Sequence, residues 1–239
     1  MWNYQTVSVI FPTYAEKDSI YNVICNFSNS GYVDEIVVVN NNAQEGTDEA
    51  VRKTHAVLVH EKKQGYGFAI QRGFREAKGD ILIVAEPDGT FEGRDMVKLL
   101  SYSDDFPVVF GTRTTRELIW RGANMGFFLR WGNWMVAKMM EVLFNTTILT
   151  DMGCTLKLFK REALTRIWDK FTVGTSHFGC ELMLLTIMHR IRFIEIPVNY
   201  KERVGISSVT GSWTKTTLVG LQMIYLILKY RIRMLVHGG

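Results

Sequence analysis

Hydrophobic and polar positions follow two alternating patterns along the first half of the chain. Short continuous apolar runs, typical of strands buried on both faces, occur at residues 7–12, 35–40, 56–60, 81–85 and 107–111. Between them lie stretches with apolar residues on one helical face, at 16–29, 46–54 and 64–79, the last ending at Gly79. This repetition predicts an α/β fold with a mostly parallel central sheet flanked by helices.

The second half of the chain is richer in large apolar side chains. Residues 118–144 contain many Trp, Phe and Met residues, with Arg121, Arg130 and Lys138 between them. Apolar helices are predicted at 178–190 and 216–235, and a strand at 192–200. We expect one α/β domain over residues 1–211, including an amphipathic segment at 116–145, and a C-terminal amphipathic helix over residues 212–239.

Composition narrows the functional classes. The chain has 239 residues, of which 47% are hydrophobic and 22% charged, so it can bury a core. A net charge of +4 is too small to indicate nucleic-acid binding by itself. The three cysteines form no CxxC motif, which favours free thiols in a reducing compartment. The N-terminus does not have the pattern of a signal peptide, and no apolar run reaches the roughly 18–20 residues that a membrane span needs.

Polar residues gather where the predicted strands end. Pro12, Tyr14 and Glu16 follow the first strand, and Asn40 to Asn42 follow the second. Glu86 and Asp88 follow the fourth strand, and Arg113 follows the fifth. Because parallel strands end at the same edge of a sheet, we expect these groups to line one ligand-binding edge.

The carboxylate pair in the sequence EPDG, residues 86–89, suggests a metal site. Mg²⁺ and Mn²⁺ prefer oxygen ligands and share their coordination shell with substrate phosphates. Pro-Asp-Gly is also common turn chemistry, so the tripeptide alone favours a simple turn over a metal site. Two carboxylates close to Glu16 and the Asn-rich loop would, however, repel one another without a cation.

Several motifs occur in a recognisable order. These are PTYAE (12–16), VVVNNNAQEGTDE (37–49), the run from KKQGYGF to AEPDGTF (62–91), GTR (111–113), RGAN (121–124), TDMGCTLKLFKREAL (150–164) and RVGIS (203–207). Together they resemble a family 2 glycosyltransferase of the GT-A fold. The resemblance covers roughly residues 6–210, and is greatest to the group of dolichyl-phosphate mannose synthases and bacterial polyprenyl-phosphate glycosyltransferases.

The resemblance implies a nucleotide-sugar donor, Mg²⁺ or Mn²⁺ as cofactor, and sugar transfer to a lipid phosphate with inversion at the anomeric carbon. It implies donor-nucleotide contacts at Pro12, Tyr14, Glu16, Asn40, Gln64, Ala85, Glu86 and Arg203. It implies metal ligation by Glu86 and Asp88, catalytic roles for Asp88, Asp151 and Arg121, and acceptor-phosphate contacts from Arg113, Arg121 and Asn124. For Asp151 we favour a positioning role over that of a general base, because a phosphate acceptor is already anionic.

Three positions depart from the family's usual pattern. Asn40 replaces the usual Asp after the second strand, the metal motif begins with Glu86 in place of Asp, and Ser208 stands where a Lys is common. Asn at position 40 is compatible with either GDP-mannose or a UDP-hexose as the donor, so the nucleotide stays open.

The aromatic and basic segments indicate membrane contact. Met and aromatic stripes at helical spacing often belong to a core, but residues 118–144 carry too many large apolar groups for one narrow stripe. Basic residues between them, and Lys229, Arg231 and Arg233 in the last helix, fit helices lying in an anionic membrane interface. We therefore expect a cytoplasmic protein, peripheral to the membrane, that acts on a polyprenyl or dolichyl phosphate.

Two other functions stay open at this point. The same fold and donor would serve a soluble glycan or protein acceptor, although RGAN and the aromatic helices then have no clear use. A catalytically silent, membrane-associated relative is the other, suggested by Asn40 and Ser208. A separate membrane-protein partner is compatible with the lipid-phosphate transferase and with the silent relative. No nucleic-acid partner is expected.

Overall fold

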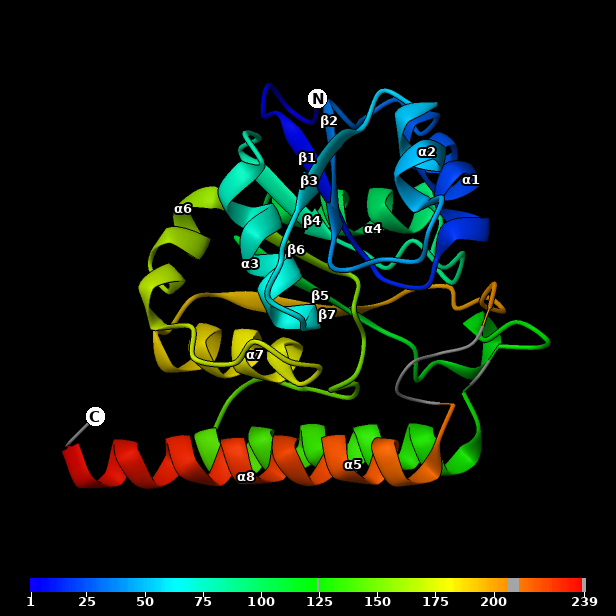
Figure 1. Ribbon diagram of the computed structural model, residues 1–239. Helices are drawn as coiled ribbons and strands as arrows, with labels where there is room; N and C mark the ends of the chain where they lie inside the picture. Colours follow the sequence, from blue (N-terminus) through cyan, green and yellow to red (C-terminus); the bar gives the residue numbers. More distant parts are fainter. Residues whose placement is uncertain (124, 206–210, 238–239) are drawn as a thin grey trace.

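The computed structural model describes residues 1–123, 125–205 and 211–237, and its centre is a seven-stranded sheet (Figure 1). The strands are β1 (Val7–Thr13), β2 (Glu35–Asn40), β3 (Val57–His60), β4 (Ile81–Val84), β5 (Val108–Thr112), β6 (Lys157–Lys160) and β7 (Phe193–Pro197). Their order is β3-β2-β1-β4-β6-β5-β7. All neighbouring strands are parallel except at β6, which is antiparallel to both β4 and β5. The predicted α/β class and mostly parallel sheet are confirmed.

Helices cover both faces of this sheet. They are α1 (Lys17–Ser28), α2 (Thr47–Arg52), α3 (Tyr66–Glu76), α4 (Gly93–Ser103), α5 (Phe127–Phe144), α6 (Arg161–Thr165), α7 (Phe178–Met188) and α8 (Trp213–His237). Two short 3-10 helices, η1 (Arg116–Leu118) and η2 (Trp168–Lys170), lie between them. Alternate residues of β1 point to opposite faces, so Ile10 joins one buried cluster while Val9 and Phe11 join the other.

The prediction that the third helix ends at Gly79 is wrong, since α3 ends at Glu76. Gly79 does not cap the helix. It lets the backbone before β4 pass close to Ser8 of β1. A Cβ atom at this position would lie 2.6 Å from Ser8 Oγ and 2.7 Å from Ser8 N. Any larger residue would therefore push the start of β4 away from β1.

Helices α5 and α8 lie side by side along one side of the molecule, next to α7 (Figure 1). The inner face of α8 is buried in the core through Met223, Leu226, Ile227 and Tyr230. Tyr230 Oη also donates a hydrogen bond of 2.8 Å to the buried carboxylate of Glu181 on α7. The outer faces of both helices expose large apolar side chains. Among the described residues, no helix combines the length and apolar character needed to cross a bilayer.

Candidate active site

The strand directions bring the predicted polar groups to one edge of the sheet. β1, β2 and β4 are parallel, and β5 regains the same direction because two antiparallel steps through β6 separate it from β4. The segments after these four strands therefore leave the sheet at the same edge. This geometry follows from chain connectivity alone and does not depend on side-chain placement.

Asp88 and Arg203 form the centre of a charged cluster at this edge. Arg203 Nη2 lies 3.1 Å from Asp88 Oδ2 and 3.5 Å from Glu16 Oε1. Thr90 donates to Asp88 Oδ1 from its backbone N at 2.9 Å and from Oγ1 at 2.6 Å. Val204 N donates to the backbone oxygen of Asp88 at 2.8 Å, which holds the segment carrying Arg203 over the strand end.

Of the Glu86 and Asp88 carboxylates, Glu86 has its negative charge less well compensated by neighbouring groups. Desolvation by the surrounding protein raises the pKa of Glu86 to about 8, and repulsion from the Asp88 carboxylate adds to this effect. The nearby Arg203 opposes the rise, while Glu16 contributes to it. Three carboxylates thus share one guanidinium, and a divalent cation would offset the excess negative charge.

The residues present fit a metal-bound diphosphate. Within the described residues no group of three or more His, Cys, Asp or Glu side chains is arranged to hold a metal ion unaided. Two carboxylates are enough where substrate phosphates complete the shell, which is how Mg²⁺ is commonly bound. In addition, the Nε of Arg203 is buried and has no hydrogen-bond partner among the described residues, so it has a donor to offer an incoming oxygen.

The residues expected to contact the nucleotide lie around this cluster. Tyr14 is 49% exposed, whereas Pro12 and Ala85 are buried beneath the edge. Glu16 Oε2 accepts hydrogen bonds from the backbone N atoms of Tyr14 at 2.7 Å and Ala15 at 2.9 Å, so its second oxygen faces Arg203. This arrangement fixes the loop after β1.

Asn40 and Gln64 both take part in local hydrogen bonds. Asn40 Oδ1 accepts from Ala43 N at 2.7 Å, and its Nδ2 donates to Asp48 Oδ1 at 2.6 Å. Gln64 Oε1 accepts from Asn42 Nδ2 at 2.9 Å. A nucleotide contact from either amide would therefore compete with these bonds, and their donor-binding roles stay predictions.

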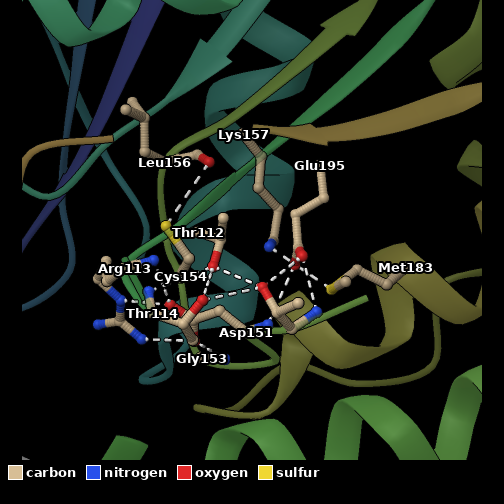
Figure 2. Close-up of polar contacts among 11 residues, drawn as sticks. Thr112, Arg113, Thr114, Asp151, Gly153, Cys154, Leu156, Lys157, Met183 and Glu195 are labelled. Atoms are coloured by element: carbon tan, nitrogen blue, oxygen red, sulfur yellow. Dashed lines mark hydrogen bonds and ion pairs between the residues drawn. The ribbon is translucent and has the colours of Figure 1, made fainter. Parts of the chain in front are cut away.

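Arg113 and Asp151 form a buried, bidentate ion pair (Figure 2). Arg113 Nε lies 2.8 Å from Asp151 Oδ2, Nη2 lies 2.9 Å from Oδ1, and the Arg113 backbone N donates to Oδ2 at 2.9 Å. Burial alone would raise the pKa of Asp151, but the Arg113 guanidinium and its hydrogen bonds outweigh burial and lower it. A carboxylate held this firmly in its charged form is a weak proton acceptor.

Sequence reasoning missed the partners that position this pair. Gly153 N donates to Asp151 Oδ1 at 3.0 Å, and a Cβ on Gly153 would lie 2.5 Å from Asn133 Oδ1 and 2.9 Å from Arg113 Nη2. Asn133 belongs to α5, so this helix reaches the site directly. In the sequence, only the two small residues Gly153 and Cys154 indicate this close approach.

A second missed cluster fixes the loop before β6. Glu195 on β7 accepts hydrogen bonds from Thr150 N at 2.6 Å, Thr150 Oγ1 at 2.7 Å and Asp151 N at 3.1 Å (Figure 2). Thr150 Oγ1 also lies 2.8 Å from Thr112 Oγ1 at the end of β5. Lys157 begins β6 nearby and is 2% exposed. Strand β6 itself was not predicted, because lysines bound its short apolar core.

Of the remaining acceptor-side predictions, Arg121 lies within the described residues, shortly after η1. Arg121 is exposed, at a turn in which Gly122 has a left-handed φ of +83°. Asn124 and Ser208 lie outside the described residues. Arg121 is therefore open to solvent, whereas Arg113 is buried in its pair with Asp151.

Comparison with known proteins agrees with this arrangement. A dolichyl-phosphate hexose transferase of Haloferax volcanii is 24% identical over 98% of this chain and 99% of its own length. A dolichyl-phosphate beta-glucosyltransferase of Saccharomyces cerevisiae is 24% identical over 94% of this chain and 76% of its own length. The crystal structure of glucosyl-3-phosphoglycerate synthase from Mycobacterium tuberculosis with Mn²⁺, uridine diphosphate and phosphoglyceric acid superposes with a TM-score of 0.76. It is 16% identical, over 95% of this chain and 79% of the other.

The family match covers most of the sheet and the site. Residues 8–168 match Glycosyl transferase family 2, a range that includes the strand-end carboxylates and the Arg113–Asp151 pair. The strand order and the covering helices give the fold of the solved glycosyltransferase. The chain therefore belongs to glycosyl transferase family 2 and is a glycosyltransferase.

Proposed function

We propose that this chain is a metal-dependent, inverting glycosyltransferase that moves a hexose from a nucleotide-diphosphate sugar to a polyprenyl or dolichyl phosphate at the cytoplasmic face of a membrane. One observation carries the proposal. Helix α5 exposes an aromatic face and also places Asn133 beside Gly153 and Arg113 in the site. The names of the two dolichyl-phosphate transferases among the relatives support the acceptor class.

On the donor side, Glu86 and Asp88 would hold Mg²⁺ or Mn²⁺, the ions found with the solved glucosyl-3-phosphoglycerate synthase. The ion would supply positive charge to the leaving diphosphate. Arg203 has a free buried Nε among the described residues and would bind the same diphosphate. Pro12, Tyr14 and Glu16, with Asn40, Gln64 and Ala85, would enclose the base and ribose. GDP-mannose and UDP-hexoses are both candidate donors.

The transfer is a single displacement at the anomeric carbon. An oxygen of the acceptor phosphate forms the new bond on one face, while the bond to the diphosphate oxygen breaks on the other and its electron pair leaves with the nucleotide. No proton needs to be removed, because the acceptor is already an anion. The low pKa that Arg113 imposes on buried Asp151 agrees with a positioning role for this carboxylate.

On the acceptor side, Arg113, Arg121 and Asn124 are the proposed contacts for the lipid phosphate. The apolar chain would lie against the exposed faces of α5 and α8. Their exposed apolar residues are Phe127, Phe128, Trp131, Trp134, Met135 and Val142 on α5 and Trp213, Leu218, Leu221, Tyr225, Leu228, Ile232, Leu235 and Val236 on α8. Phe128 and Trp213 pack edge to face with 5.7 Å between their ring centroids, so the two exposed faces are in contact at this point. Helices of this kind lie in the membrane interface.

Two measurements test the proposal. Thermal unfolding with UDP, GDP, CDP or ADP, each with and without Mn²⁺, should show a metal-dependent shift for one nucleotide, because ligand at 100 times its Kd adds about 2.7 kcal/mol of stability. Transfer of labelled sugar from the matching donor should then occur to polyprenyl phosphate in vesicles, and be lost in Asp88→Ala.

The controls separate the other functions. Phosphoglyceric acid, a free glycan and a protein serve as soluble acceptors in parallel reactions. Preferential transfer to a soluble acceptor would overturn the lipid-phosphate assignment while keeping the donor site. Nucleotide binding without transfer to any acceptor, or no nucleotide binding at all, would favour the catalytically silent relative.

A further inference from the structure

Glu195 of β7 lies next to the two segments that carry the Arg113–Asp151 pair. In the sheet register Glu195 is opposite Phe110 of β5, and Thr112 is two residues further along β5. Because side chains alternate along a strand, Glu195 and Thr112 share one face of the sheet. The carboxylate is therefore close to the end of β5, which Arg113 follows directly.

Both oxygens of the Glu195 carboxylate accept hydrogen bonds from the loop before β6. Oε2 accepts from Thr150 N at 2.6 Å and from Thr150 Oγ1 at 2.7 Å, while Oε1 accepts from Asp151 N at 3.1 Å (Figure 2). The two backbone N–H groups can only donate, so the contact requires an acceptor at each oxygen position. An ionised carboxylate provides this, whereas a carboxamide places an NH₂ donor at one of the two positions.

Three threonine hydroxyl groups extend this contact to the segment that carries Arg113. Thr114 Oγ1 donates to Thr150 Oγ1 at 3.0 Å, and Thr112 Oγ1 lies 2.8 Å from Thr150 Oγ1 and 2.9 Å from Thr114 Oγ1. Each hydroxyl has one proton, and Thr150 donates its proton to Glu195, so the carboxylate is the final acceptor of this chain of hydroxyl groups. Arg113 lies between Thr112 and Thr114 in the sequence, so its backbone is held on both sides.

Glu195 approaches the ion pair from outside. Together with the threonines of this cluster it lines an open hollow of about 370 Å³. Neither Arg113 nor Asp151 is among the described residues that line this hollow, and Asp151 is fully buried. Glu195 therefore acts on the pair through Thr150 and through the backbone of Asp151.

We propose that Glu195 is a positioning residue for the acceptor phosphate, and that it acts through the Arg113–Asp151 pair. The inference rests on the proposed function, which assigns Arg113 to the lipid phosphate. A guanidinium group offers a phosphate oxygen one fixed direction only while the backbone on both sides of the pair stays in place. Glu195 and the threonines hold this backbone, whereas Asp88 is held by Thr90 and Arg203. The effect of Glu195 is therefore confined to the acceptor side.

The test compares Glu195→Gln and Glu195→Asp with the wild type and with Glu117→Gln, a control at an exposed position in η1. For each full-length protein we measure the Kd of the nucleotide diphosphate with Mn²⁺, the kcat and KM for polyprenyl phosphate in vesicles, and the melting temperature. Glu195→Gln should lower kcat/KM for the acceptor roughly 10- to 100-fold, because its NH₂ group meets an N–H donor and displaces the loop. The nucleotide Kd should not change.

Glu195→Asp keeps both acceptor oxygens on a shorter side chain and should recover part of the activity that Glu195→Gln loses. Glu117→Gln should match the wild type in every quantity. A purely structural role for Glu195 would instead lower nucleotide affinity and acceptor kcat/KM in parallel.

Thr150→Val separates positioning from charge. Burial lowers the pKa of the nearby Lys157 amine, and the Asp151 and Glu195 charges oppose this effect, so Glu195→Gln also changes the charge around Lys157. Thr150→Val removes one hydrogen bond to Glu195 and leaves that charge in place. It should lower kcat/KM for the acceptor by a smaller factor than Glu195→Gln does. In the double variant the two losses should not multiply, because both changes act on the same loop.

Each other outcome has a defined meaning. If Glu195→Gln transfers sugar to polyprenyl phosphate as the wild type does, or if the losses of the two single variants multiply, the positioning role is overturned and the proposed function stands. If nucleotide affinity falls together with acceptor kcat/KM, Glu195 supports the site as a whole and the positioning role is again overturned. If the wild type binds a nucleotide but transfers no sugar to polyprenyl phosphate, the proposed acceptor is wrong and this inference falls with it.

Discussion

Glu86 combines a raised pKa with a position where a metal ion would need a carboxylate. Its pKa moves from an ordinary value of 4.5 to about 8 in the folded chain, through desolvation and the Asp88 charge. Between these values the folded chain binds more protons at this group than the unfolded chain does. The contribution of Glu86 to stability therefore decreases as pH rises from about 4.5 to 8.

Metal binding should accordingly release a proton from Glu86. At pH 7, titration of the nucleotide-bound protein with Mn²⁺ should release close to one proton, and the metal affinity should increase by up to about tenfold per pH unit below pH 8. Calorimetry in buffers with different ionisation enthalpies measures the proton count. Glu86→Gln is the control and should release none. A wild type that binds Mn²⁺ without proton release would contradict the assignment.

The Arg113–Asp151 pair should matter for folding as well as for activity. Arg113→Met leaves a fully buried carboxylate without its guanidinium, which costs about 3–5 kcal/mol for pairs of this kind. Urea unfolding should show a correspondingly lower midpoint. Arg116→Met, at an exposed position in η1, should change stability by less than about 0.5 kcal/mol. Equal midpoints for the two variants would mean that Asp151 is compensated by other groups.

At the level of helices and strands, the sequence predicted those elements whose apolar pattern is uninterrupted. β1 and β4 are buried along their length and β2 is buried between its two end residues, so their apolar runs identify them. β6 was missed because Lys157, a core position, carries a charged residue, and a hydrophobicity pattern counts it as polar.

The sequence predicted the edge that carries Glu86 and Asp88 better than the surroundings of Arg113 and Asp151. The edge that carries Glu86 and Asp88 follows from strand direction, which the sequence pattern determines. Asn133 and Glu195 were not predictable, because they reach the site from α5 and β7 through contacts distant in sequence. Asn40 shows the opposite case, since its side chain bonds Ala43 and Asp48 within its own loop.

A buried hydrogen bond from Tyr230 to Glu181 joins α8 to α7, and its removal should loosen α8 selectively. Tyr230→Phe deletes the hydrogen bond to Glu181, which keeps those from Thr172 and Val173. We expect a loss of about 1–3 kcal/mol and faster amide hydrogen exchange in α8. Tyr225→Phe, on the exposed face of the same helix, should change neither quantity. Unchanged exchange in Tyr230→Phe would show that apolar packing alone holds α8.

Gly153 should be essential at the junction between α5 and the loop before β6. Gly153→Ala places a Cβ 2.5 Å from Asn133 Oδ1 and 2.9 Å from Arg113 Nη2, so both side chains must move. We expect at least about a 100-fold loss in kcat/KM, as displacements near 1 Å produce in well-oriented sites. Gly132→Ala on α5 meets nothing within 4 Å and serves as the control. Full activity in Gly153→Ala would show that the Arg113–Asp151 pair does not need to be tightly fixed at this junction.

In the molecule as a whole, the exposed apolar faces of α5 and α8 lie on one side of the sheet, and α1 and α4 cover the other side. Trp131→Glu and Trp213→Glu, on the exposed faces of α5 and α8, should each lower binding to anionic vesicles roughly tenfold or more, measured by flotation. Tyr102→Glu, an exposed aromatic on α4 across the sheet, should bind as the wild type does. Equal flotation of all three variants would place the membrane contact elsewhere.

The inward faces of α5 and α8 have a consequence for any shortened form of this enzyme. Met223 of α8 lines a cavity together with Gly153, and Asn133 of α5 lies beside Gly153. Deleting either helix would therefore remove part of the wall next to the Arg113–Asp151 pair as well as an exposed apolar face. A more polar variant should instead be made by replacing outward-facing residues of α5 and α8 while the inward-facing residues stay unchanged.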